Sequence, residues 1–263
     1  IICGWHLIKK KLKKNKTNFI PLDSEHFSIW KIINNEDSKN IEKIILTASG
    51  GPFLKKSKKK ISNIKPKYAL KHPQWKMGKK ISIDSSTMMN KVFEFIEAKK
   101  IFNLKKNYIS IFIHPSSFVH AIVLFKGGIT KFLAHETDMM VPISNALGIK
   151  KNFKNKVILN KILNNKKLFF SSPKEKIFPL LKIIKLLPMK DSYFETILIS
   201  LNDNLVNKYL KGEINYISIH LNLLNLIKQP YLTKFYKLKP SSIYDIRKMI
   251  SITNAYLEKN YKY

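Results

Sequence analysis

Three acidic side chains are the first candidates for chemistry, because acids are scarce in this chain. It carries 17 Asp and Glu residues against 49 Lys and Arg residues. Asp23 and Glu25 are two residues apart, so in an extended segment both carboxylates point to one face and can reach a single cation. Such hard oxygen ligands favour Mg²⁺ or Mn²⁺ over zinc, and Glu94 is a candidate third ligand. The competing interpretation is a pair of solvated acids in a loop.

A second set of side chains is suited to a phosphate group. Ser49, Ser85, Asn90 and Lys91 offer hydroxyl and amide donors and one compact positive charge, and backbone N–H groups lie near an expected helix start. Together they predict an anion site. The alternative for the Ser-Ser-Thr run at residues 85–87 is that it only caps a helix.

A long polar and basic connection over residues 55–79 follows the Gly50-Gly51 pair, which forces the chain out of a strand. Connections of this length are usually functional or disordered. It carries His72 and Trp75, which could close over a bound sugar phosphate, so residues 49–79 are a candidate flap. The alternative is that a His and a Trp in a flexible loop have no role in binding.

The elements that must position these side chains follow from apolar runs and turn residues. The segment 4–15 predicts a basic helix, and residues 88–102 predict a helix with Met89, Val92, Phe93 and Ile96 on its apolar side. Residues 84–87 are the expected caps of that helix. Strands are predicted at residues 19–22, 41–47, 80–83, 108–113, 118–125 and 129–134, the last two forming an antiparallel hairpin.

Beyond residue 148 the pattern weakens into a connection rich in Asn and Lys. Four amphipathic stretches follow, separated by Pro188, Gly212 and Pro230. They predict a small helical bundle with helices at residues 177–187, 192–210, 217–227 and 243–257.

Composition excludes several classes of protein. The 263 residues, 44% of them hydrophobic, can bury a core for one large domain with a smaller appendage. Apolar runs fall far short of the ~20 residues that span a bilayer, so we expect no transmembrane helix. An apolar start before a basic run reverses the order of a secretory signal, and the single Cys3 excludes an internal disulfide framework. We therefore expect a cytoplasmic protein.

The formal net charge of +32 raises the question of nucleic acid. The excess is nearly all Lys, spread along the chain beside abundant Ile and Asn, which indicates a bias of composition. We expect no nucleic-acid partner, and a basic nucleic-acid-binding protein is kept as the less favoured alternative.

Several strings of this chain together resemble the 1-deoxy-D-xylulose 5-phosphate reductoisomerase family. The resemblance is close over residues 20–142 and weaker afterwards, and it is carried by Leu22-Asp23-Ser24-Glu25-His26, Ser49-Gly50-Gly51-Pro52-Phe53, His72-Pro73-Gln74-Trp75-Lys76-Met77-Gly78, Asp84-Ser85-Ser86-Thr87-Met88-Met89-Asn90-Lys91, Glu94-Phe95-Ile96-Glu97-Ala98 and Ile113-His114-Pro115-Ser116-Ser117.

The resemblance implies an NADPH-dependent oxidoreductase and isomerase that makes 2-C-methyl-D-erythritol 4-phosphate in the non-mevalonate isoprenoid pathway. It implies that Asp23, Glu25 and Glu94 bind Mg²⁺ or Mn²⁺, with Co²⁺ as a further option, and that the enzyme is a homodimer. Trp75 and Met77 would belong to the closing flap, and Gly78 would lie beside the cofactor. The implied substrate-binding residues are Ser24, Glu25, Ser49, His72, Ser85, Asn90, Lys91 and Glu94.

The resemblance also sets the expected fold: α/β, with an α+β catalytic domain on a mixed sheet and a small C-terminal helical bundle. Family members begin with a Rossmann-type domain, of which we expect only the last helix and strand, at residues 1–22. The catalytic domain would cover residues 23–148 with its flap at 49–79, a linker residues 149–175, and the helical domain residues 176–263.

The chain departs from the family in two respects. A family string Asn-Ala-Ala-Asn-Glu is shortened here to Leu201-Asn202-Asp203-Asn204, so we expect altered packing of the helical domain against the active site. The Gly-rich turn of the Rossmann-type domain is not found in the 263 residues. One interpretation is an enzyme whose NADPH domain comes from a separate chain; the other is a non-catalytic remnant that binds metal and sugar phosphate.

Overall fold

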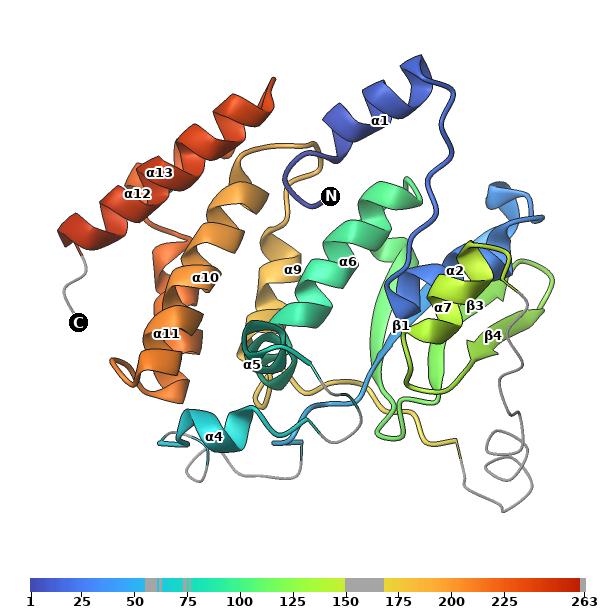
Figure 1. The fold of residues 1–263 in the computed structure, drawn as a ribbon, viewed down its shortest axis with the longest axis horizontal. Helices are drawn as coiled ribbons and strands as arrows, with labels where there is room; N and C mark the ends of the chain where they lie inside the picture. The colour runs from blue at the N-terminus through green and yellow to red at the C-terminus, as the bar shows by residue number, and fades with distance from the viewer. Residues whose placement is uncertain (55–60, 62, 73–74, 76, 150–167, 261–263) are drawn as a thin grey trace.

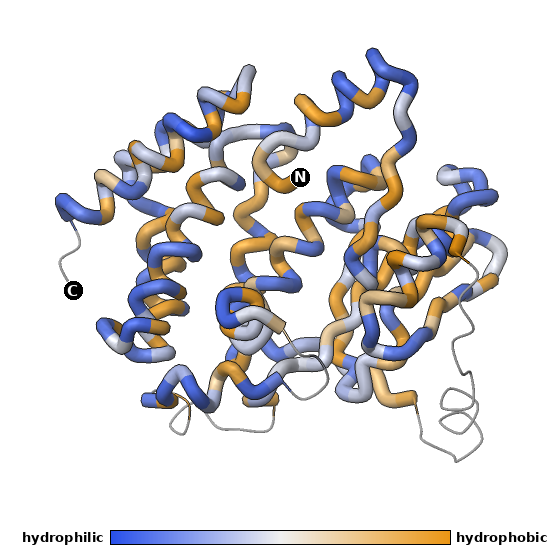
Figure 2. Tube along the Cα trace, in the orientation of Figure 1, coloured by the Kyte–Doolittle hydropathy of each residue, from blue (hydrophilic) through white to orange (hydrophobic). Residues whose placement is uncertain are grey.

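The structure is a computed structural model that describes residues 1–54, 61, 63–72, 75, 77–149 and 168–260. A four-stranded sheet occupies one side of the molecule and a helical bundle the other, with helix α6 (Met89–Ile101) between them (Figure 1). Hydrophobic segments occur in both halves (Figure 2), and most of the buried apolar residues form one core cluster that runs from the sheet into the bundle. The two halves therefore share a core.

The sheet is mixed, as expected from the sequence. Its strand order is β2-β1-β3-β4, in which β1 (Ile41–Ala48) is parallel to β2 (Ile109–Ile113) and antiparallel to β3 (Val119–Phe125). Strand β4 (Thr130–Ala134) pairs antiparallel with β3 through a turn that carries positive φ angles at Gly127 and Gly128. The predicted hairpin is confirmed.

Two helices cover the sheet beside the site. Helix α2 (Ser24–Ile33) packs on β3 and β4 and contacts α7 (Met140–Ala146), while α6 contacts β1 and β2. The central strand β1 is buried along most of its length, which explains why its apolar run is nearly continuous.

The predicted helical bundle is present at the C-terminal side. Helix α10 (Phe194–Lys211) contacts α11 (Tyr216–Leu226), α13 (Ile243–Asn260) and α5 (Lys79–Thr87). The spacing of Met249, Thr253 and Leu257, the buried residues of α13, is that of one helical face. The short helical elements are η1 (Ser38–Asn40), α4 (Pro66–Ala69), η2 (Lys106–Tyr108), η3 (Pro179–Lys182), α9 (Ile183–Leu186) and α12 (Pro230–Thr233).

Two predicted strands are wrong. Residues 80–83 belong to helix α5, where an ion pair between Lys80 and Asp84 at i and i+4 outweighs the alternation of Ile81 and Ile83. Residues 19–22 are irregular, and Pro21 there has no N–H to give to a sheet.

A third correction concerns the expected helix caps. Residues 84–87 form the last turn of α5, which ends at Met88 in the left-handed conformation with φ of 63°. Helix α6 begins at the next residue, so the Ser-Ser-Thr run ends one helix instead of capping another.

The first residues pack against the C-terminal bundle. The basic helix α1 (Trp5–Lys14) is present as predicted, Ile2 belongs to the common core, and His6 Nε2 lies 2.7 Å from the carbonyl oxygen of Pro240. Of the expected linker, residues 150–167 lie outside the described residues, while Ser171 forms a β-bridge with Ile113. Among the described helices, none combines the length and apolar character needed to cross a membrane.

Candidate functional site

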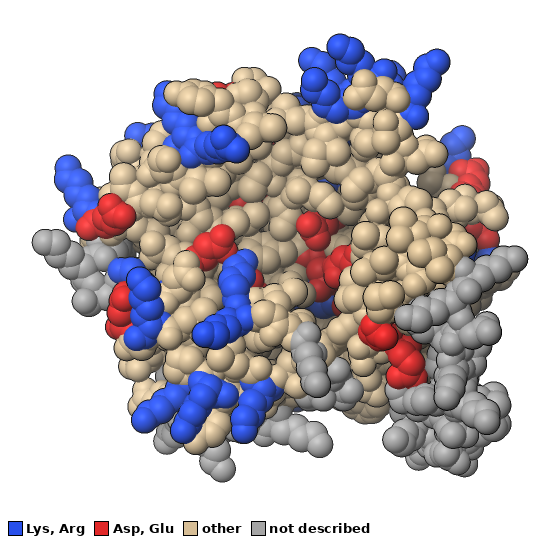
Figure 3. Space-filling model, viewed as in Figure 1, with Lys and Arg blue, Asp and Glu red and all other residues tan. Residues whose placement is uncertain are grey.

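A pocket of ≈ 300 Å³ lies where the end of β1 meets the beginning of α2 and the junction of α5 and α6. Nearly all sequence-predicted site residues border it, so segments far apart in the chain converge as expected. The face in Figure 3 shows acidic side chains gathered in a central hollow and basic ones toward the edges. The pocket is lined by Asp23, Ser24, Glu25, Thr47, Ala48, Ser49, Gly50, His72, Trp75, Met77, Ile81, Ser85, Met88, Asn90, Lys91, Glu94, Ser117, His120 and Met139.

The three predicted metal-binding carboxylates meet at one side of this pocket. Asp23, Glu25 and Glu94 each have an oxygen within 4.8 Å of the others. The local geometry is not the extended segment that their spacing suggested: Asp23 is the N-cap residue of α2, and Glu25 lies in its first turn. A donor set of three carboxylates fits Mg²⁺ or Mn²⁺.

Lys91 connects two of these acids. Its Nζ lies 2.6 Å from Glu25 Oε1 and also donates to Glu94 Oε2. Burial raises the pKa of Glu25, but nearby positive charge, first of all that of Lys91, and the hydrogen bonds from Lys91 and Ser24 together outweigh burial and hold that pKa at about 2. Burial and the neighbouring Glu25 charge raise the pKa of Glu94 well above its usual value. One ammonium thus serves two carboxylates in a site that favours a further cation.

The remaining oxygens of the two glutamates are also held by hydrogen bonds. Ser24 Oγ donates to Glu25 Oε2 at 2.5 Å, and Asn90 Nδ2 donates to Glu94 Oε1 at 2.6 Å. Both carboxylates are therefore fixed in orientation by side chains that line the same pocket.

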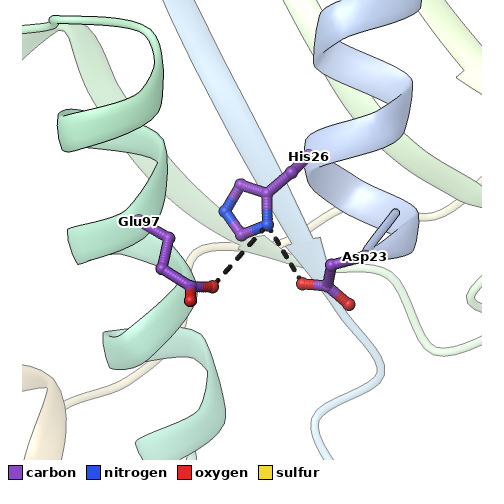
Figure 4. Close-up of side chains that lie close together, drawn as sticks. All are labelled: Asp23, His26 and Glu97. Atoms are coloured by element: carbon purple, nitrogen blue, oxygen red, sulfur yellow. Dashed lines mark hydrogen bonds and ion pairs between the residues drawn. The ribbon is translucent and has the colours of Figure 1, made fainter. Parts of the chain in front are cut away.

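His26 lies between the carboxylates of Asp23 and Glu97 (Figure 4). Its Nε2 must donate to the Glu94 carbonyl oxygen at 2.9 Å, since a carbonyl only accepts. Its Nδ1 faces Asp23 Oδ2 at 3.1 Å and Glu97 Oε2 at 3.9 Å. Burial lowers the pKa of His26, but the bond to Asp23 and the surrounding acids raise it to about 9. The protonated ring therefore links two candidate metal ligands.

The predicted phosphate-binding residues are likewise brought together. Ser49 follows β1, Ser85 lies in the last turn of α5, and Asn90 and Lys91 lie in the first turn of α6. The N-terminus of α6 is directed to this place, and the positive end of a helix dipole favours an anion.

Gly51 allows the close approach of the two segments that carry Ser49 and Ser85. Its φ is 65°, and a Cβ at this position would lie only 3.2 Å from the Ser85 carbonyl oxygen and from the Ser86 Cα. A larger residue would push the two segments apart, so the site requires glycine here.

His72 holds Ser49 in a defined hydrogen-bonding state. The Trp75 backbone N–H donates to His72 Nδ1 at 2.9 Å, so the hydrogen of the neutral ring is on Nε2 and points to Ser49 Oγ at 3.1 Å. Ser49 Oγ also accepts from the Gly51 N–H at 3.1 Å. Because the oxygen accepts twice, the Ser49 hydroxyl hydrogen can be donated to a ligand. Burial and Lys91 lower the pKa of His72 to about 4.

The flap residues fall only partly within the described chain. Trp75 and Met77 line the pocket, and the Trp75 ring lies 6.2 Å from that of His120. Residues 55–60, 62, 73, 74 and 76 of the predicted flap lie outside the described residues. Gly78, predicted to lie beside a cofactor, is the N-cap residue of α5. Its neighbour Met77 lines the pocket, whereas Gly78 itself does not.

Sequence reasoning missed several residues of the pocket wall. Ser117 and His120 come from the β2–β3 connection and from β3, and Met139 precedes α7. His120 stacks on His135 with ring centroids 3.7 Å apart, and burial beside that ring lowers the pKa of His120 to about 4. The Ser116-Ser117 pair shortly before β3, with His120 as the second residue of that strand, is a signal that could have indicated this wall.

Comparison with known proteins identifies relatives along almost the whole chain. A family model described as the 1-deoxy-D-xylulose 5-phosphate reductoisomerase C-terminal domain matches residues 19–102, and a second, the DXP reductoisomerase C-terminal domain, matches residues 135–255. The second match covers the part in which the sequence strings are weak.

Curated relatives carry the same name. The 1-deoxy-D-xylulose 5-phosphate reductoisomerase of Pelagibacter ubique is 51% identical over 255 residues, which are 95% of this chain and 64% of that protein. The protein of the same name from Wolbachia sp. subsp. Drosophila simulans is 44% identical over 83% of this chain and 57% of its own length. The chain thus spans about six tenths of these relatives.

Solved structures agree with these matches. A DOX-P reductoisomerase in complex with NADPH, fosmidomycin and magnesium is 30% identical, with a TM-score of 0.86, over 98% of this chain and 68% of that one. The Zymomonas mobilis enzyme in complex with NADPH is 26% identical with a TM-score of 0.83. The resemblance and the α/β fold class expected from the sequence are confirmed, and the chain belongs to the 1-deoxy-D-xylulose 5-phosphate reductoisomerase family.

Proposed function

We propose that this chain forms the metal- and substrate-binding part of an enzyme that isomerises 1-deoxy-D-xylulose 5-phosphate and reduces the product with NADPH. The observation that carries the proposal is one pocket in which Asp23, Glu25 and Glu94 converge beside Ser49, Ser85, Asn90 and Lys91. Acids for a divalent cation and donors for a phosphate are the two features that a sugar phosphate chelating a metal needs.

Each wall of the pocket has a part in this scheme. Asp23, Glu25 and Glu94 would hold Mg²⁺ or Mn²⁺, which when bound polarises substrate oxygens as a Lewis acid. Ser24 and Asn90 keep the glutamates oriented through their hydrogen bonds. These contacts support preorganisation, because the carboxylates need not search for their positions.

The wall formed by the end of β1, the last turn of α5 and the first turn of α6 would bind the phosphate group. The Ser49 and Ser85 hydroxyls donate hydrogen bonds, Lys91 supplies charge, and the N-terminus of α6 supplies backbone dipoles. Trp75 and Met77 would close over the sugar and exclude water, which strengthens every polar contact inside.

NADPH, a homodimer and a cytoplasmic setting complete the proposal. Solved relatives bind NADPH, and in this chain the nicotinamide would lie near Met77 and Gly78. The dinucleotide-binding unit would come from a further segment or a separate chain. The single cysteine is compatible with a reducing compartment.

A calorimetric titration with Mn²⁺ and fosmidomycin, comparing wild type with Glu94→Gln, tests the proposal. We expect inhibitor binding that requires Mn²⁺ and is lost in the variant. A folded wild-type chain that binds neither Mn²⁺ nor fosmidomycin would overturn it. Binding of both without NADPH turnover, even after a dinucleotide-binding partner is supplied, would favour a non-catalytic remnant.

A further inference from the structure

Ser85 is a predicted phosphate-binding residue, and both of its neighbours in the chain are buried. Asp84 and Ser86 are each 2% exposed, while Ser85 itself is half-buried and lines the pocket. The orientation of Ser85 therefore depends on what holds residues 84 and 86.

The helical bundle holds both neighbours. From α10, Asn202 Nδ2 donates to Asp84 Oδ1 at 2.8 Å, and from α11, Tyr216 OH donates to Ser86 Oγ at 3.1 Å. Asn202 and Tyr216 are almost completely buried, with exposed fractions of 0% and 1%. Helix α5 contacts α10 directly, and the bond between Tyr216 and Ser86 joins it to α11.

Asp84 is further tied on its other oxygen. Lys80 Nζ lies 2.7 Å from Asp84 Oδ2 and 2.9 Å from Asp203 Oδ1. Two consecutive residues of α10, Asn202 and Asp203, therefore contact polar side chains of α5. These are residues of the shortened string 201–204, for which altered packing against the site was expected. The string keeps a direct polar contact with the element that bears Ser85.

The hydrogen-bond arrangement leaves little freedom for this turn. Ser86 Oγ donates to the Ile83 carbonyl at 2.8 Å and accepts from Tyr216, so its hydrogen is already used. The Ser85 carbonyl accepts from the Met88 N–H at 3.1 Å, where the chain turns into α6. A shift of the turn would therefore move Ser85 and the first turn of α6 together.

We propose that Asn202 and Tyr216 are positioning residues for the phosphate group of the substrate: by fixing Asp84 and Ser86 they set the direction of Ser85 into the pocket. This inference rests on the proposed function, since it assumes a phosphate monoester at Ser85. It assigns the C-terminal bundle a role in binding in addition to folding, because loss of a buried hydrogen-bond partner frees a turn that a ligand must then order.

The test compares Asn202→Leu and Tyr216→Phe with two matched controls. Ser200→Ala removes a 2.9 Å hydrogen bond from α10 to Asn254 of α13, and Tyr236→Phe removes a 2.5 Å bond to the Ile227 carbonyl. Each control therefore removes one hydrogen bond within the bundle that does not involve α5. Affinities for glycerol 3-phosphate and for Mn²⁺ are measured by calorimetry on the full chain.

We expect the affinity for glycerol 3-phosphate to fall roughly fivefold in Asn202→Leu and in Tyr216→Phe, as loss of about 1 kcal/mol implies. Mn²⁺ affinity stays within twofold of wild type, and the controls change neither affinity. In a Ser85→Ala background the effect of Asn202→Leu should vanish, because the two residues act through one contact.

Three results would overturn the inference. Folded Asn202→Leu and Tyr216→Phe chains with wild-type phosphate affinity would leave these residues a structural role alone, and should Asn202→Leu not fold, Tyr216→Phe decides. A parallel loss of Mn²⁺ and phosphate affinity would indicate general distortion of the pocket. An effect that persists in the Ser85→Ala background would exclude action through Ser85. A wild-type chain that binds Mn²⁺ but no phosphate ester would contradict both the inference and the proposed function.

Discussion

Lys91 Nζ lies 2.6 Å from Glu25 Oε1, and the same ammonium donates to Glu94, so one buried lysine pairs with two of the three acids proposed to bind a metal. Lys91 is only 5% exposed and Glu94 only 3%. The position of this ammonium makes the lysine a partner of the metal-binding acids as well as a candidate phosphate ligand.

Substituting Lys91→Met should destabilise the chain in the absence of added metal. Removing one partner of a buried ion pair leaves an uncompensated charge and costs about 3 kcal/mol of unfolding free energy. Mn²⁺ should then stabilise the variant more than the wild type, because a cation restores the lost charge. Thermal unfolding with and without Mn²⁺ measures both effects.

Lys131→Met is the matched control, because Lys131 pairs with Glu36 on the surface and its side chain is 47% exposed. It should unfold as the wild type does, with the same response to Mn²⁺. An equal response to Mn²⁺ in Lys91→Met and wild type would show that Lys91 does not offset the metal-binding acids.

His26→Gln should weaken Mn²⁺ binding by about tenfold or more, as expected when a group that orients metal ligands is lost. The ring contacts both Asp23 Oδ2 and the Glu94 carbonyl oxygen, so the substitution removes a contact that orients each of these two candidate metal ligands. Calorimetric titration with Mn²⁺ measures the change. Glu97→Gln, which alters only the longer 3.9 Å contact of the ring, should have a small effect; the reverse ranking would contradict this assignment.

His72 should stay neutral well below the usual range of an imidazole. Its pKa is lowered to about 4, so between pH 6.5 and 4 the unfolded chain binds a proton that the folded chain does not. The stabilisation from this group is therefore present above pH 6.5 and is lost as the pH falls toward 4.

An NMR titration of the histidine ring carbons measures the pKa of His72 directly, with His72→Asn to assign its signal. The Nε2–H tautomer should persist down to about pH 4, and titration near 6.5 would contradict the geometry in which Trp75 N–H donates to Nδ1.

Lys100 should contribute stability without affecting the site. Its Nζ lies 2.6 Å from Asp191 Oδ1 and 2.9 Å from Glu195 Oε1, which joins the end of α6 to the start of α10. Lys100→Met should lower the unfolding free energy by about 3 kcal/mol, as measured in urea. Unchanged stability, or a loss of Mn²⁺ affinity in the folded variant, would show that this contact has a different role.

The sheet could be predicted from sequence because its strands carry local signals. The apolar run of β1 and the Gly127-Gly128 turn between β3 and β4 each determine a local conformation. The parallel pairing of β1 with β2 joins residues such as Ile44 and Ile109, far apart in sequence, and no local pattern reports it.

The predictions of local structure were wrong where polar contacts determine the backbone conformation. Residues 80–83 alternate like a strand, yet Lys80 pairs with Asp84 and Ser82 Oγ donates to the Gly78 carbonyl, both helical contacts. Asp23 and Glu25 converge as predicted, but from the start of a helix rather than from an extended segment. Residue types indicated the candidate site, whereas its geometry depends on contacts such as those of His26.

The most direct test of the central claim is the number and identity of the protein ligands to Mn²⁺. Titration followed by electron paramagnetic resonance should show one tight Mn²⁺ per chain, lost in Asp23→Asn, Glu25→Gln and Glu94→Gln and retained in Glu97→Gln. This result would place the cation among Asp23, Glu25 and Glu94. Tight binding that survives Glu94→Gln but is lost in Glu97→Gln would place it at Asp23, His26 and Glu97 instead and contradict the account.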